Sequence, residues 1–356
     1  MTVYYLIFII SFILCFFDFV KSKVIKFFPY LVVAVSLVLF VGLRYPGIDN
    51  DSKNYIDMLE FYKFSSYQDI WEGGYGYVEK GYVLLNKVLG ELGGNYTSLF
   101  LVMALLTVLY NYWFFFKNSI YPFFSLLFYL SFFFIYRDFT QIRYALSAAI
   151  CFWVVYYYVN NKYKTMVFHL ILAMSFHNAS VILIPALLVI RFVRVEKLLL
   201  LLPFPALVIG LSINLFPILI LSGLGNEHVV NVYSQEEGGA GFAVSIIGYA
   251  IMLLYFSINY LNKNSVTISK KENIYFKLVA FSVIVNFLFI NSGIAQRFSY
   301  ILFQFSILLL PILLDKIRIK TGRIEAFFLI YLIIACFFVY YGIRMIDLNL
   351  VRPYRI

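Results

Sequence analysis

Long, continuously apolar runs recur along this chain and limit what it can fold into. A helix that crosses the hydrocarbon core of a bilayer needs about 20 such residues. The runs are continuous rather than alternating, which favours helices over the strands of a membrane barrel. We therefore predict an all-α, polytopic integral membrane protein with about ten full spans. The predicted spans are residues 3–19, 25–43, 96–116, 121–137, 139–159, 198–220, 242–261, 275–292, 296–314 and 324–342.

The composition supports this class and excludes others. Hydrophobic residues make up 63% of the chain and charged residues 13%, which is more apolar than a soluble core requires. The net charge of +10 could indicate nucleic-acid binding. The basic residues lie in short loops between apolar runs, however, where the preference for positive loops in the cytoplasm explains them, so we expect no nucleic-acid partner. The three cysteines lie within apolar runs without metal-type spacing, so neither disulfides nor a zinc site are indicated.

The basic loops also predict the orientation of the spans. Lys21, Lys23 and Lys26 place the first loop in the cytoplasm and the N-terminus outside. The first run, Tyr4 to Phe19, lacks a basic leader and a small-residue cleavage site, so we interpret it as a retained span. Residues 44–95 then lie outside, and they hold eight acidic residues against five Lys and Arg.

The stretch 164–192 decides the orientation of everything after it. If this stretch crosses the membrane once, the later basic loops all lie outside, although loops rich in Lys and Arg are normally cytoplasmic. If it enters and returns as a helical hairpin bent near His177–Asn178, these loops are cytoplasmic and the acidic loop around Glu227, Glu236 and Glu237 is external. We predict the hairpin, with both termini outside. The basic residues concerned are Lys263, Lys270, Lys271, Lys316, Arg318, Lys320 and Arg323.

We predict a single transmembrane domain over residues 1–356, with the external segment 44–95 as a helical subdomain. Its residues 52–64 have Tyr55, Leu59 and other apolar side chains at helical spacing after a cap at Asp51 or Ser52. Residues 78–92 show the same spacing, and the glycine-rich piece 71–77 between them indicates a hinge or a loop of close approach.

Four arginines lie in or at the rims of apolar runs, on the side that the topology predicts to be external. Placing a guanidinium at the edge of the lipid costs free energy, so such a group usually faces a partner or a water-filled cavity. Each also has a simpler interpretation. Arg44 and Arg297 could extend to the interface, Arg137 could pair with Asp138, and Arg143 could bond helix-end carbonyls.

Five short segments at this external side carry most of the polar residues. In them the chain resembles the EpsG-like, Wzy-type polymerases of bacterial surface polysaccharides. Two shared features lie in the exported region: an Arg followed by a Gly and an Asp-rich turn after an early span, and an acid–x–Gly–Tyr motif. Two more lie further along the chain: a Gln-Ile-Arg motif in a mid-chain span, and a bend that contains a His. The segments are RYPGIDNDSKNY (44–55), YGYVEKGYVLLN (75–86), FTQIRYALSAA (139–149), SFHNASVILIP (175–185) and GIAQRFSYIL (293–302).

The resemblance implies a glycosyltransferase reaction at the periplasmic face of the bacterial inner membrane. Oligosaccharide repeat units arrive on undecaprenyl pyrophosphate, and the growing chain moves to the next unit as the lipid pyrophosphate leaves. The product would be an O-antigen, capsule or exopolysaccharide, and a separate co-polymerase would regulate its length. No cofactor is implied. Asp49 and Asp51 have the spacing of metal-binding acids in nucleotide-sugar transferases, but a lipid-linked donor needs no metal, so we expect none.

The residue types suit that chemistry. Arginine side chains bind phosphate oxygens through two N–H groups and stabilise the negative charge that develops on a leaving pyrophosphate. We therefore predict that the pyrophosphate is bound by Arg143, Arg297, Arg44 and Arg137. His177 is a candidate base for the acceptor hydroxyl, because its ordinary pKa is about 6.5. Glu79 and Asp51 are alternative bases. For the sugar we expect carboxylate, amide and ring contacts from Asp49, Asn178, Tyr55 and Tyr82, although the DNDSK stretch is also an ordinary turn and helix cap.

Two other functions remain open from the sequence. A flippase for lipid-linked oligosaccharides would need cationic groups reachable from both sides, whereas the arginines here gather on one side. A membrane O-acyltransferase would also use a histidine, but it needs a route from a cytoplasmic acyl donor, and His177 is predicted on the other face.

Overall fold

The structure is a computed structural model that describes residues 1–72, 78–193, 197–215, 242–260, 267–347 and 351–355. Helices and irregular turns are the secondary structure within these ranges, with no strand among them. The chain divides into two compact units. Unit 1 comprises Met1–Asn178 and Thr321–Ile356, and unit 2 comprises Ala179–Lys320. Whether they work as the single predicted domain stays a prediction.

Unit 1 is a bundle in which one helix occupies the centre. In α8 (Ile142–Val159), 67% of the residues in an 18-residue apolar stretch are buried, against 28% in the spans formed by α1 with η1, by α2 and by α19. The small residues Ala145, Ser147 and Ala149 are buried in α8, which lets its neighbours approach closely. The other helices of the bundle are α1 (Thr2–Leu14), η1 (Cys15–Phe19), α2 (Lys23–Gly42), α6 (Tyr96–Asn118), α7 (Pro122–Tyr129), η2 (Leu130–Phe134), α9 (Tyr163–Phe176) and α19 (Ile324–Asp347).

Unit 2 is arranged around α16 (Lys270–Leu288), which packs against α10, α12, α15 and α17. Lys316 of α18 lies 2.7 Å from Glu272 of α16 and bonds Asn259 of α15, so a buried polar cluster joins three helices. The helices around α16 are α10 (Leu183–Phe192), α11 (Leu198–Leu201), α12 (Pro203–Ser212), α15 (Phe242–Asn259), α17 (Gly293–Phe303) and α18 (Ser306–Thr321).

The all-helical, multi-pass class is confirmed. Six helices in the described ranges are long and apolar enough to cross a membrane, or seven if the pair α17 and α18, bent by 40°, counts as one span. Of the other four predicted spans, 275–292 corresponds to α16 and 296–314 to this bent pair, whereas 121–137 and 198–220 correspond to the shorter apolar helices Pro122–Phe134 and Leu198–Ser212. Pro122–Phe134 is shorter than the predicted 121–137 because the backbone leaves the helix before Arg137.

The predicted break at His177 is confirmed. α9 ends at Phe176, His177 has extended backbone (φ −161°, ψ 129°), and a new helical segment, η3 (Asn178–Ile182), leads into α10. The two arms belong to different compact units, so the hairpin itself stays a prediction. The acidic loop around Glu227, Glu236 and Glu237 lies outside the described residues, as does most of the predicted hinge at 71–77.

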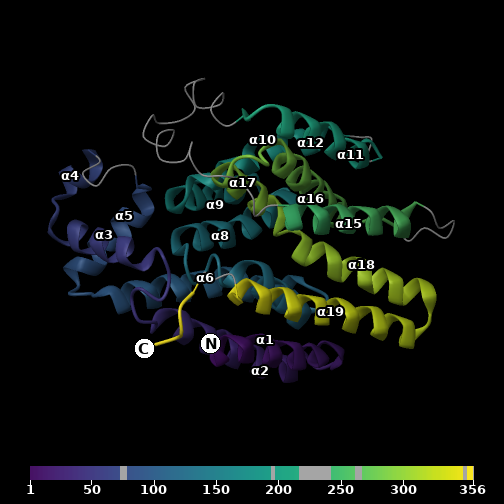
Figure 1. The fold of residues 1–356 in the computed structure, drawn as a ribbon, viewed down its shortest axis with the longest axis horizontal. Helices are drawn as coiled ribbons and strands as arrows, with labels where there is room; N and C mark the ends of the chain where they lie inside the picture. Colours follow the sequence, from purple (N-terminus) through teal and green to yellow (C-terminus); the bar gives the residue numbers. More distant parts are fainter. Residues whose placement is uncertain (73–77, 194–196, 216–241, 261–266, 348–350, 356) are drawn as a thin grey trace. The chain divides into compact units, whose positions relative to one another are not determined.

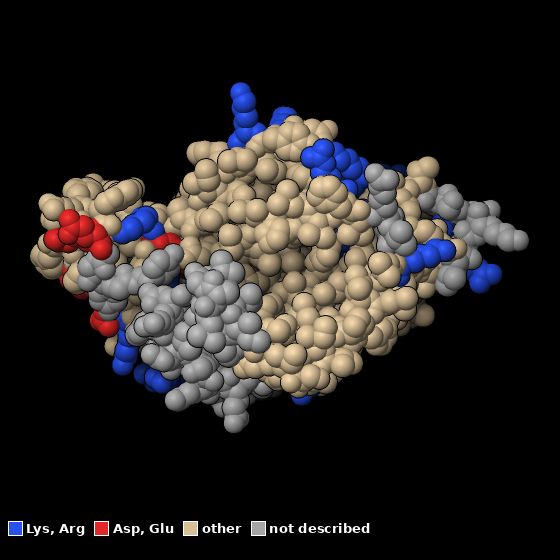
Figure 2. Space-filling model, turned by 90° about the horizontal axis from the view of Figure 1, so that it is seen from above, with Lys and Arg blue, Asp and Glu red and all other residues tan. Residues whose placement is uncertain are grey.

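The segment 44–95 forms a helical subdomain at one end of unit 1, which we call the subdomain end (Figure 1). It contains α3 (Ser52–Phe64), α4 (Tyr67–Glu72) and α5 (Lys80–Glu91), which confirms the helices predicted at 52–64 and 78–92. Figure 2 shows acidic side chains gathered over this part. Asp57, Glu60, Asp69, Glu72 and Glu91 are exposed there.

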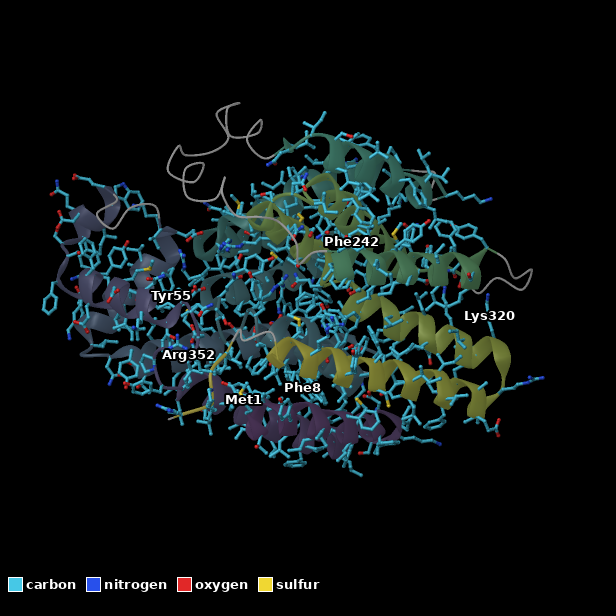
Figure 3. The ribbon with its side chains drawn as sticks, viewed as in Figure 1. Met1, Phe8, Tyr55, Phe242, Lys320 and Arg352 are labelled. Atoms are coloured by element: carbon cyan, nitrogen blue, oxygen red, sulfur yellow. The ribbon has the colours of Figure 1, made fainter. Side chains whose placement is uncertain are left out.

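Several chain segments meet at the subdomain end. The backbone N–H of Arg352 donates to the carbonyl of Ile48, which is in segment 44–95, at 2.8 Å. The Tyr4 hydroxyl donates to the carbonyl of Arg352 at 3.1 Å, so the beginning of α1 lies at this end too. Met1, Tyr55 and Arg352 lie toward the same end of unit 1 (Figure 3). The opposite end is closed differently: the Asp18 carboxylate accepts hydrogen bonds from the backbone N–H groups of Phe123 (3.0 Å) and Phe124 (2.8 Å), and so caps α7.

Candidate active site

An ion pair between Arg143 and Glu79 is the centre of the candidate site. Arg143 is in the first turn of α8, and its Nη1 lies 2.6 Å from Oε2 of Glu79, the residue before α5. The second oxygen of Glu79 accepts a hydrogen bond of 3.2 Å from the backbone N–H of Asn178. The side chains of Arg143 and Glu79 are 22% and 8% exposed. One carboxylate therefore joins the subdomain, the central helix and the break after α9, and the Arg143 side chain is partly exposed.

Two tyrosines of the subdomain pack beside this pair. The Tyr82 ring centre is 5.5 Å from the guanidinium carbon of Arg143, and the Tyr55 ring meets Tyr82 edge-on at 6.0 Å. Burial raises the pKa of Tyr82, and it raises that of Tyr55 against the opposing effect of Arg143. Both side chains are buried, and both hydroxyls keep their protons at neutral pH and are hydrogen-bond donors.

His177 lies next to the same pair through its neighbour Asn178. Its backbone carbonyl accepts a hydrogen bond of 3.2 Å from Ser147 of α8, and its ring meets Tyr144 edge-on at 5.0 Å. Tyr144 also contacts Arg137, whose guanidinium carbon is 4.5 Å from the Tyr144 ring centre. The structure thus brings together five predicted site residues: Arg143, Glu79, Tyr82, Tyr55 and Asn178. His177 and Arg137 flank them.

Arg137 differs from Arg143 in its surroundings. It is 2% exposed, and its guanidinium also lies over the Phe133 ring at 4.3 Å. The neighbouring carboxylate of Asp138 accepts hydrogen bonds from the hydroxyls of Tyr129 (2.5 Å) and Tyr112 (3.5 Å). Arg137 is therefore enclosed by aromatic rings, and its predicted role in binding pyrophosphate stays a prediction.

Arg44 and Asp49 form a second, fully enclosed ion pair. Nε of Arg44 lies 3.0 Å from Oδ2 of Asp49, and neither side chain is exposed. The guanidinium also donates to the Val41 carbonyl and lies 4.0 Å from the Phe100 ring centre. Burial lowers the pKa of Arg44, and the Asp49 carboxylate opposes this effect. The pair is enclosed by protein, and its predicted contacts to pyrophosphate and sugar stay predictions.

Asp49 also performs the helix capping predicted for Asp51 or Ser52. Asp51 is the N-cap residue of α3 by position, but its side chain makes no capping hydrogen bond. The Asp49 carboxylate instead accepts from the backbone N–H groups of Asp51 (2.9 Å) and Ser52 (2.8 Å). Asp51 remains half-buried at this turn, and its predicted role as a base is untested.

Arg297 lies in unit 2, as the fifth residue of α17. This helix is capped by Ser292, whose hydroxyl accepts from the N–H of Ala295 at 3.3 Å. The side chain of Arg297 is half-buried. Its predicted place in one pocket with Arg143 stays a prediction, because the two residues belong to different compact units.

Comparison with known proteins identifies the family. A family model described as the EpsG family matches residues 27–356. The chain belongs to the EpsG family. This membership makes it a membrane protein of polysaccharide biosynthesis, in a family associated with glycosyltransferase-like polymerases. No curated protein and no solved structure matches it.

One residue of this EpsG-family site was missed in the sequence. Gly81 lies in the first turn of α5, and a Cβ there would be 2.4 Å from the Ser175 hydroxyl and 2.7 Å from its carbonyl oxygen on α9. Only glycine allows α5 to approach α9 this closely, which holds Glu79 next to Asn178. Glycine inside a helix lowers its stability by about 1 kcal/mol relative to alanine, so its place in the acid–x–Gly–Tyr motif was a signal of close packing.

The chemistry of the site rests on carboxylate, guanidinium, imidazole and phenol groups. Within the described ranges, no three His, Cys, Asp or Glu side chains come together as metal ligands. The predicted independence from metals is a separate claim and stays untested. A shallow groove elsewhere in unit 1, lined by Tyr110, Trp153, Tyr157, Leu109 and His169, contains none of the predicted site residues.

Proposed function

We propose that this EpsG-family protein is a polymerase that joins oligosaccharide repeat units carried on undecaprenyl pyrophosphate. The reaction is a glycosyl transfer at the periplasmic face of the bacterial inner membrane. The observation that supports it is the Arg143–Glu79 pair at the subdomain end, where a guanidinium and a carboxylate lie 2.6 Å apart beside two tyrosines.

The bond changes match these groups. The acceptor hydroxyl oxygen attacks the anomeric carbon of the donor, and the bond from that carbon to the pyrophosphate oxygen breaks. The hydroxyl proton goes to Glu79 or His177, and the negative charge that collects on the departing diphosphate is stabilised by Arg143. Guanidinium suits this task because its N–H groups match two phosphate oxygens. The Tyr55 and Tyr82 phenols bind sugar hydroxyls.

The ion pair itself indicates how binding leads to catalysis. The Glu79 carboxylate accepts a hydrogen bond from the Arg143 guanidinium, where a phosphate oxygen of the substrate would bind. The carboxylate and the phosphate would therefore compete for the same guanidinium. Arrival of the diphosphate displaces Glu79 and frees it as a base. Substrate binding would therefore release Glu79 from its partner and leave its carboxylate available to the acceptor hydroxyl.

The charge pattern supports an external position for the site. The subdomain end contains the acidic segment 44–95, whereas Lys21, Lys23 and Lys26 lie in the first loop at the opposite end of α1 and α2. Positive loops favour the cytoplasm. Lipid carriers move within the bilayer, and a site beside the subdomain would accept them from the outer leaflet.

The test replaces Arg143 in the cell. Arg143→Ala should leave the protein expressed in the membrane but give surface glycan that stops at a single repeat unit, because the leaving group has lost its cation. Arg318→Ala is the matched control, since Arg318 is 47% exposed in unit 2 and pairs only locally with Asp315. Long glycan ladders in the Arg143 variant would remove this residue from the mechanism.

A gene deletion separates this function from the flippase. Loss of a polymerase leaves single repeat units at the cell surface, whereas loss of a flippase abolishes their export. Complete absence of surface glycan after deletion would therefore favour the transporter.

A further inference from the structure

Residues 351–355 pair with the turn that follows α2. The backbone N–H of Tyr45 donates to the Arg355 carbonyl at 2.9 Å, and the N–H of Arg352 donates to the Ile48 carbonyl at 2.8 Å. A backbone hydrogen bond in each direction therefore joins two segments that are distant in sequence. We call residues 351–355 the strap. None of the motifs in the sequence pointed to it.

Tyr354 anchors the strap to the membrane helices. Its hydroxyl donates to the Phe40 carbonyl at 2.9 Å, and its ring stacks on the Phe40 ring at 4.3 Å with an angle of 12°. On α1, the Tyr4 hydroxyl donates to the Arg352 carbonyl. The Arg352 and Arg355 side chains are exposed, and the hydrogen bonds named above are made by the backbone of the strap and by the Tyr354 hydroxyl.

Two routes lead from the strap to the candidate site. The first passes through the turn 45–48 to the Arg44–Asp49 pair, and from Asp49 to the start of α3, which carries Tyr55. The second is aromatic: the Phe40 ring lies 5.6 Å from Phe139, which precedes α8 and its Arg143. The guanidinium of Arg44 also lies 5.0 Å from Phe139, so the two routes meet.

We propose that the strap positions the candidate active site and that Tyr354 is its positioning residue. The proposal rests on the proposed function for its catalytic consequence. The strap holds the turn 45–48 against α1 and α2, which keeps Asp49 on Arg44 and fixes the start of α3. Tyr55 and the beginning of α8 then stay at the distance that lets Arg143 and the tyrosines act together. Small displacements of positioned groups reduce turnover strongly.

The experiment compares Tyr354→Ala with Tyr354→Phe and with Arg352→Ala in the full-length protein in detergent or nanodiscs. Tyr354→Ala should lower kcat for defined lipid-linked repeat units by about tenfold, with little change in melting temperature. Tyr354→Phe keeps the stacked ring and should recover most of the activity. Arg352→Ala should behave as wild type, since its backbone contacts remain.

Hydrogen exchange provides a readout independent of catalysis. Tyr354→Ala should speed amide exchange in residues 44–52 and 139–143, and Arg352→Ala should not. If the wild-type protein shows no polymerase activity, the proposed function fails while faster exchange still supports the strap. Unchanged exchange in these two segments would overturn the strap proposal. So would a loss of activity that only follows a lower melting temperature, because that result indicates a general structural role.

Discussion

At the scale of single residues, the location of the partner carboxylate distinguishes the arginines. Arg44 pairs with Asp49, five positions away, inside one buried turn. Arg143 pairs with Glu79, 64 positions away, at a junction that is partly exposed. A local, enclosed pair is suited to stability, whereas a pair between separate elements is able to exchange partners. We therefore expect different consequences when each pair is broken.

Breaking the enclosed pair should unfold the protein more easily. Asp49→Ala leaves the Arg44 charge buried without its carboxylate, and such changes lower the free energy of unfolding by about 3–5 kcal/mol. Thermal unfolding of the purified protein measures this, with the exposed Asp57→Ala on α3 as the control. A melting temperature equal to that of the control would show that the pair does not stabilise the turn.

Changing the carboxylate of the junction should affect turnover. Glu79→Gln keeps a hydrogen-bonding group beside Arg143 but removes the proton acceptor, so kcat should fall by about 10²–10⁴-fold if Glu79 is the base. The same assay on His177→Ala decides between the two candidates. If both variants polymerise at wild-type rates, the acceptor proton is removed by another group.

The sequence predicted the residue types of this site but not their pairing. Arg143, Glu79, Tyr55, Tyr82 and Asn178 were all selected from motifs, and the structure brings them together. Arg44 looked like Arg143 because both lie at the rims of apolar runs. Their difference depends on which carboxylate folds against each, and a one-dimensional pattern contains no such information.

At the scale of elements, helix positions follow the apolar pattern closely, and irregular backbone does not. The helices at 52–64 and 78–92 and the break at His177 were predicted, because spacing and polar bends are visible in the sequence. The spans predicted at 121–137 and 139–159 leave only a short break at Arg137–Asp138, but the structure has the π-helical η2 at 130–134 and then turns at 135–140 before α8. Hydropathy records burial, and it does not record how the backbone is hydrogen-bonded.

The packing of α5 on α9 is testable at Gly81. In Gly81→Ala the new methyl group meets both the side chain and the backbone of Ser175, so α5 must move away from α9. Overpacking of this kind lowers the free energy of unfolding by about 1–3 kcal/mol. It should also shorten the glycan, since Glu79 moves with α5. Leu84→Ala on the exposed face of α5 is the control. Wild-type glycan length in Gly81→Ala would contradict a required close approach.

The Asp18 cap of α7 supports the opposite end of unit 1. Asp18→Ala removes the acceptor for two backbone N–H groups and should lower the free energy of unfolding by about 1–2 kcal/mol. Tyr331→Phe is the comparison, because it keeps the cap and removes the hydroxyl that donates to the Asp18 carboxylate and to the Cys15 carbonyl. Equal melting temperatures for Asp18→Ala and the wild type would show that the cap contributes little.

At the scale of the whole molecule, the account requires the site to face outside and Arg297 to lie on the same face. The sequence predicts this from loop charges, and the structure describes each compact unit by itself. Single-cysteine labelling in cells tests it. Cysteines at Lys53 and Arg297 should react with an impermeant reagent, whereas one at Lys162 should react only after permeabilisation. Cys336 is exposed and must first be replaced, while Cys15 and Cys151 are buried.

The central claim is that this EpsG-family protein transfers glycan between lipid carriers with Arg143 at the leaving pyrophosphate. The most direct measurement incubates purified protein with defined undecaprenyl-pyrophosphate-linked repeat units. The wild-type protein should give a ladder of products and release undecaprenyl pyrophosphate, and Arg143→Ala should leave single units. Single units from an intact, folded wild-type protein, or an unchanged ladder from the variant, would contradict it.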